Sequence, residues 1–94
     1  MYESSFRTHA VSAKGKTLIL NAATSTVAEG ELTAELTDEE GKPIPGFTRS
    51  DYQPWQGDSK AQPARWRGGN ACPRDRAAAR FFLRRSRLYG YAWQ

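Results

Sequence analysis

The C-terminal segment 77–93 alternates with a period of two. In its first half Ala77, Ala79, Phe81 and Leu83 form one set of alternate residues, and Ala78, Arg80, Phe82 and Arg84 form the other. After a polar step at 84–87, Leu88, Gly90 and Ala92 alternate with Tyr89, Tyr91 and Trp93. Only an extended chain places alternate residues on opposite faces. The segment is therefore predicted to form two β-strands joined by a short turn, as a closing hairpin.

Other short segments of the chain also have the pattern of strands. Residues 30–37 alternate most clearly, and the ranges 6–11, 17–21 and 62–67 are weaker or shorter candidates. The acidic stretch 38–42 is typical of a hairpin turn, in which Gly41 takes the positive φ angle. The two prolines of 43–47 cannot donate ladder hydrogen bonds, which predicts a sheet edge or a bulge there.

Short strands separated by turn residues, with no clear helix, predict an all-β fold. We expect an antiparallel β-sandwich, jelly-roll-like in topology. A length of 94 residues fits a single domain that spans 1–94. The residues expected in its core are Leu18, Leu20, Leu32, Ala34, Leu36, Trp66, Phe81, Leu83 and Leu88.

Charge is distributed unevenly along the chain, whose net charge is +4. Eight arginines and a single acid, Asp75, lie between Arg65 and Arg87, whereas six acids lie between Glu29 and Glu40. This split is consistent with a basic binding face. It is equally typical of two oppositely charged strands that attract each other across a sheet. We favour a role within the fold over a binding role.

The residue types that catalysis or metal binding requires are scarce. Cys72 is the only cysteine, which excludes an internal disulfide framework. His9 is the only histidine, and the chain offers it no obvious partners for a nucleophilic triad. Asp51 and Asp58 lie in one loop and are better suited to turn and cap roles than to a glycosidase carboxylate pair. A calcium ion held by these two carboxylates and by carbonyls is the alternative. We expect no catalytic set, no resident metal and no cofactor.

Two binding functions remain open. Tyr52 and Trp55 are candidate carbohydrate-binding residues, because sugar rings stack on aromatic faces, whereas Trp66 is expected in the core. The tail arginines with the aromatic residues of 89–93 would alternatively form a basic stacking surface for single-stranded nucleic acid. That partner is disfavoured, because no dedicated nucleic-acid-binding signature is present. No apolar run approaches the roughly 20 residues of a membrane span, so no membrane partner is expected.

A series of short motifs along residues 6–93 resembles a known family. The motifs are 15–22, 30–38, 41–47, Asp51, Gly57–Asp58, Trp66–Gly68 and the closing stretch 79–89. In order and spacing they resemble the C-terminal β-sandwich of large bacterial glycoside-hydrolase-like proteins of the family 32 kind. In those proteins a β-propeller precedes the sandwich. One departure is the final turn, where Arg85-Ser86-Arg87 replaces the usual acidic residue.

The resemblance implies a non-catalytic accessory domain, because the catalytic carboxylates of such proteins belong to the propeller. Its expected roles are structural support of an N-terminal propeller domain or weak carbohydrate binding. The chain is accordingly expected to be a detached or truncated C-terminal module. A missing strand ahead of Phe6 would leave an open sheet edge, through which the isolated chain would self-associate.

Overall fold

The computed structural model describes residues 4–24, 31–53 and 60–94. The described residues form seven strands and one short 3-10 helix. These are β1 (Ser4–Arg7), β2 (Val11–Ser12), β3 (Leu18–Thr24), β4 (Glu31–Thr37), η1 (Arg49–Asp51), β5 (Lys60–Pro63), β6 (Arg76–Arg84) and β7 (Ser86–Trp93).

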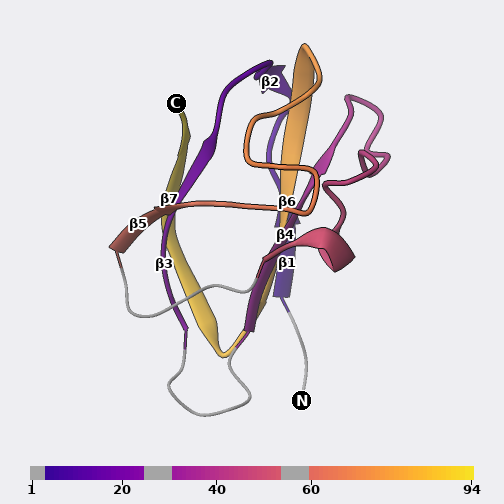
Figure 1. Cartoon of the computed structure of the whole chain (residues 1–94). Helices are drawn as coiled ribbons and strands as arrows, with labels where there is room; N and C mark the ends of the chain where they lie inside the picture. The colour runs from indigo at the N-terminus through magenta and orange to yellow at the C-terminus, as the bar shows by residue number, and fades with distance from the viewer. Residues whose placement is uncertain (1–3, 25–30, 54–59) are drawn as a thin grey trace.

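The strands form two antiparallel sheets that lie face to face (Figure 1). In the four-stranded sheet, β6 pairs with β4 along one edge and with β1 and then β2 along the other. In the three-stranded sheet, β3 lies between β5 and β7. The predicted all-β antiparallel sandwich is therefore confirmed, while the jelly-roll topology stays a prediction.

The core lies between the two sheets and contains the expected residues. Those that are buried as predicted are Leu18, Leu20, Leu32, Ala34, Leu36, Trp66 and Phe81. Leu83 and Leu88 are partly buried and pack against this cluster. Full burial of one such leucine or phenylalanine side chain contributes roughly 1.5–3 kcal/mol. The buried residues Leu32, Ala34 and Leu36 therefore hold β4 on the core.

The two C-terminal strands do not form the predicted hairpin. Strands β6 and β7 follow each other directly but lie in opposite sheets, because both edges of β6 are already paired and β7 pairs with β3. Arg85 joins them with a φ angle of 52°, in the left-handed region that residues other than glycine seldom adopt. The period-two pattern correctly indicated extended chain, but the prediction that these strands pair with each other is wrong.

A β-bulge in β7 also changes which of its side chains face inward. The register runs from Asn21 opposite Gly90 to Ala22 opposite Leu88, so that Tyr89 is the extra residue. An extra residue reverses the alternation beyond it. As a result Leu88 packs on the core before the bulge, and Trp93 packs on it after the bulge. The prediction that Leu88 and Trp93 lie on opposite faces of this strand is therefore wrong.

Of three other predicted segments, two have boundaries that differ from the prediction and one forms as predicted. The edge strand expected at 6–11 is divided into β1 and β2, both of which lie along β6. The strand expected at 62–67 begins and ends earlier, at Lys60–Pro63, although the Ala64 N–H still donates to the Leu18 carbonyl at 2.8 Å. The turn at 38–42 forms as predicted, with Gly41 at a φ angle of 89°.

Two neighbouring phenylalanines on β6 test this arrangement. Replacing the fully buried Phe81 by alanine should lower the free energy of unfolding by about 3–5 kcal/mol. Replacing Phe82, whose ring faces outward beneath Arg49, should lower it by only about 1 kcal/mol. Urea denaturation followed by circular dichroism measures both changes. Equal losses would contradict the assignment of the two rings to opposite faces.

Candidate interaction surface

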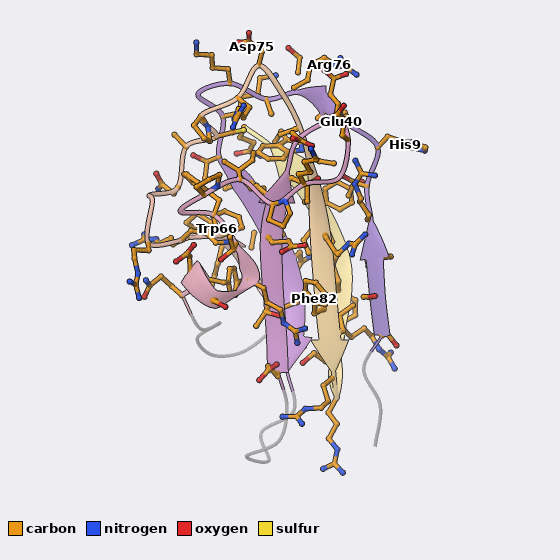
Figure 2. All side chains as sticks on the ribbon, turned by 90° about the vertical axis from the view of Figure 1, so that its right-hand side faces the viewer. His9, Glu40, Trp66, Asp75, Arg76 and Phe82 are labelled. Carbon is orange, nitrogen blue, oxygen red and sulfur yellow. The ribbon has the colours of Figure 1, made fainter. Side chains whose placement is uncertain are left out.

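One flank of the sandwich is closed by a cluster of three aromatic residues. Trp66 lies against Phe47 and Tyr52, with ring centroids 5.7 and 5.6 Å away. Its indole Nε1 donates a hydrogen bond of 2.9 Å to the Ala34 carbonyl of β4. Trp66 follows β5, so this cluster connects the β4 edge of one sheet to the β5 side of the other. Figure 2 shows Trp66 at this side of the four-stranded sheet.

A glycine lets the chain close this flank. The backbone N–H of Gly68 donates to the Gly46 carbonyl at 2.8 Å. A Cβ atom at Gly68 would lie only 2.7 Å from the Phe47 ring and 2.9 Å from that carbonyl oxygen. Because real Cβ atoms do not approach so closely, this contact requires glycine. Packing against Phe47 and Gly46 therefore explains the glycine of the Trp66–Gly68 motif.

Of the two predicted carbohydrate-binding residues, the structure describes only Tyr52. It is 8% exposed and its ring meets the edge of Trp66. A buried ring offers no face to a sugar, so we assign Tyr52 to the core. Burial also raises the pKa of Tyr52 to about 12, because the phenolate would lose its hydration. Trp55 lies outside the described residues.

The other polar candidates have structural surroundings. The Asp51 carboxylate accepts hydrogen bonds from the backbone N–H and the hydroxyl of Thr48, at 3.2 and 2.9 Å, which confirms its capping role. His9 is exposed, as expected of an edge residue (Figure 2). Cys72 is buried, and burial raises the pKa of its thiol, which keeps it unreactive. Asp58 lies outside the described residues.

The register of two strands explains part of the uneven charge of the sequence. In the pairing of β4 with β6, Glu31 lies opposite Arg84 and Glu35 lies opposite Arg80. The acidic and basic stretches therefore meet across the outer face of the four-stranded sheet. Opposite charges directly across a ladder stabilise the pairing, whereas like charges would oppose it. This confirms the prediction of two oppositely charged strands.

Arg49 of η1 covers the middle of this outer face. Its guanidinium lies 4.0 Å above the centroid of the Phe82 ring, a cation–π geometry. Its Nε donates to the Thr33 hydroxyl at 3.1 Å, and its terminal nitrogen lies 3.5 Å from the Glu31 carboxylate. These contacts fix η1 on the sheet. They also occupy the outward face of Phe82, the aromatic ring labelled on this sheet in Figure 2.

The predicted basic aromatic surface of the tail does not form as one surface. The outward residues of β6, such as Arg80 and Phe82, lie on the outer face of the four-stranded sheet, whereas β7 belongs to the other sheet. On β7, the Tyr91 ring points inward and lies 5.5 Å from that of Phe81. Tyr89 and Tyr91 of β7 are 57% and 45% exposed. The hairpin that would join them to the outward residues of β6 is absent, and nucleic-acid binding stays a prediction.

A polar hollow of about 560 Å³ lies at one end of the sandwich. Its walls carry both charges, from Asp38, Glu39, Glu40, Arg74, Asp75 and Arg76. The backbone N–H of Lys42, and less strongly that of Glu40, holds the pKa of Asp38 below its usual value. Within 4–24, 31–53 and 60–94, no group of three or more histidine, cysteine or acidic side chains is placed to hold a metal ion. The hollow is thus explained by turn-forming contacts.

The opposite flank of the sandwich, between β1 and β7, exposes aromatic residues of the core. Phe6 and Tyr91 are each 45% exposed, although both rings contact the fully buried Phe81, at centroid distances of 5.2 and 5.5 Å. Val11 of β2 is also exposed, farther along the same edge of β6. We call Phe6, Val11 and Tyr91 the open flank. Among the described residues, it contains three of the four large hydrophobic side chains that are exposed.

The open flank has no clear signal in the sequence. The pattern predicts an edge strand for Phe6, but it predicts Tyr91 on the face opposite the inward residues of its strand. The bulge at Tyr89 brings Tyr91 to the inner face, and a bulge of this kind has no clear signal in a single sequence. The uncharged run 88–93 in an otherwise arginine-rich tail is the one feature that pointed to an apolar contact.

Comparisons with known proteins add no assignment. No protein-family model matches the chain, and neither does any curated protein or solved structure that was compared. Over the parts of the chain that the structure describes, no helix is long and apolar enough to cross a lipid bilayer.

The burial of Tyr52 predicts a dependence of stability on alkaline pH. In the unfolded chain this phenol loses its proton near pH 10, while in the folded protein it keeps it until about pH 12. The unfolded state therefore binds fewer protons in this interval, and the free energy of unfolding should fall by about 2 kcal/mol as the pH rises from 10 to 12. Urea denaturation at a series of pH values measures the fall.

Two conservative variants separate this effect from general alkaline denaturation. Tyr52→Phe should lose most of the fall, because it removes the buried phenol. Tyr89→Phe, which changes an exposed phenol, should keep it. A fall of the same size in both variants would show that Tyr52 is not its source.

Proposed function

We propose that this chain is a non-catalytic accessory β-sandwich of a glycoside-hydrolase-like protein, and that it supports an adjoining domain through its open flank. The observation that carries this proposal is the exposure of Phe6 and Tyr91, two rings that contact the centre of the core. The family resemblance described above names the adjoining domain as a β-propeller.

The contrast between the two flanks supports the proposal. On the closed flank, Trp66, Tyr52 and Phe47 seal the core and hold a backbone contact that only glycine permits. On the open flank, no described segment covers Phe6 or Tyr91. Half-exposed aromatic side chains are enriched at protein–protein interfaces, because they bury large areas with little loss of side-chain entropy. A second protein surface would complete this side of the core.

The position of β1 is consistent with such a contact. Ser4–Arg7 is the first described strand and forms part of the open flank. A domain that is joined ahead of residue 4 would therefore enter next to Phe6. The one charged side chain of β1, Arg7, is turned to the outer face of the sheet, where it donates hydrogen bonds to Thr37 and to the carbonyls of Asp38 and Glu39. A neutral surface would therefore fit the open flank best.

Expression together with its neighbour tests the support role. The DNA upstream of Met1 should encode a β-propeller, and that propeller should co-purify with the 94-residue chain. Tyr91→Arg places a charge in the proposed contact and should abolish co-purification. Ser50→Arg adds the same charge on exposed η1, away from the flank, and should leave it intact. Co-purification that neither substitution changes would refute the support role. The absence of a propeller from the upstream DNA would refute it too.

Carbohydrate contact through Trp55 is the second part of the proposal. The backbone N–H of Gln53 donates to the Arg65 carbonyl at 2.8 Å, which fixes the chain just ahead of Trp55. Migration in native gels that contain soluble polysaccharides measures the contact. Retardation that is lost in Trp55→Ala and kept in Tyr89→Ala would support recognition by Trp55. No retardation on any polysaccharide would leave support as the sole role.

A further inference from the structure

We infer that two copies of this chain pair through their β7 strands wherever no adjoining domain covers the open flank. Each copy would contribute the three strands β5, β3 and β7 to one continuous six-stranded sheet. The inference rests on the same flank as the proposed function. It differs in naming a second copy as the occupant and β7 as the element that binds it.

One edge of β7 has hydrogen-bonding groups available for a new strand. Thr17 and Gln94 exchange two backbone hydrogen bonds, of 2.7 and 2.8 Å, next to the β3–β7 ladder. In an antiparallel ladder, such bonded pairs alternate with non-bonded pairs. Ala92 therefore bonds inward to β3, while Trp93 and Tyr91 direct their N–H and C=O groups toward the other edge. Among the described strands, β7 pairs with β3 alone.

The last part of this edge, residues 90–93, lacks the features that usually prevent pairing. Natural edge strands are protected by charged residues, prolines, short length or bulges. Strand β7 has eight residues and its stretch 88–93 contains neither charge nor proline. The bulge lies at Tyr89, which leaves 90–93 regular. An uncharged strand of this kind fits another uncharged strand, whereas a polyanion would require cations along the edge.

Symmetry fixes the register of the pair. In an antiparallel β7–β7 pair centred on Tyr91, the two copies of this residue exchange their outward N–H and C=O groups. The two Tyr91 rings then lie side by side on the inner face of the joined sheet, and each keeps its contact with Phe81 of its own copy. Ala92 lies opposite Gly90 of the second copy. Arg87 falls beyond the paired stretch, so that no like charges meet.

A charge-swap experiment at Ala92 tests this register. Ala92 is exposed, and in the pair its two copies lie diagonally across the symmetry axis. Ala92→Lys and Ala92→Glu should each raise the dimer dissociation constant by about tenfold, because like charges then approach. An equimolar mixture of the two variants should regain dimers, because opposite charges then meet. Ser50→Lys, on η1, should dimerise like the unchanged chain.

Sedimentation velocity from roughly 1 to 100 µM covers the range in which weak dimers dissociate. The unchanged chain should approach twice its monomer mass of 10.5 kDa at the upper end. A monomer at every concentration would overturn the inference and leave co-purification with a propeller unaffected. A dimer that neither charge at Ala92 weakens would also overturn it. Gly90→Lys, which places a charge opposite Ala92 of the second copy and has open space at its Cβ atom, should weaken the dimer as well. It gives a second test if an Ala92 variant fails to fold.

Discussion

The pairing of β6 along both of its edges determines the rest of the architecture. Strands β4, β1 and β2 occupy these edges, so the chain that leaves β6 at Arg85 cannot fold back beside it. It crosses to the other sheet instead, and β7 then faces β6 through the core. Phe81 lies at the centre of this arrangement, fully buried and in contact with Phe6 on one side and Tyr91 on the other. The two-layered fold, the core and the open flank all follow from this one pairing.

The pairing of β4 with β6 also explains the positions of several arginines in this basic chain. Arg84 and Arg80 lie opposite glutamates of β4, and Arg49 covers the Phe82 ring between them. The half-exposed pair of Arg84 and Glu31, 4.0 Å apart, contributes little energy by itself, but opposite charges across a ladder favour one register over its neighbours. Arginines that are arranged in this way contribute to the packing of the outer face of the four-stranded sheet.

The sequence allowed the strands and the core to be predicted, because alternation reports directly which side chains are buried. Leu32, Ala34 and Leu36 show this for β4, and Phe81 shows it for β6. Alternation contains no information about which strand pairs with which, so the crossover at Arg85 was missed. The bulge at Tyr89 reversed the faces of the residues after it. For Tyr52, the aromatic ring gave a binding prediction, but only the contact with Trp66 shows that the ring is used in the core.

The difference between the two flanks is best understood as a consequence of size. A chain of 94 residues removes only about 60–65% of its unfolded surface from water, so it has few large side chains with which to seal both sides of a sandwich. Trp66 and its neighbours close one side, where glycine permits the close approach of the backbone. On the other side, Phe6 and Tyr91 are already held in place by Phe81, so little further entropy is lost when they are covered. This surface is apolar and ordered in advance, and it lies next to a β7 edge that pairs with no other described strand. It therefore favours association, and under our two proposals an adjoining domain or a second copy would complete the core.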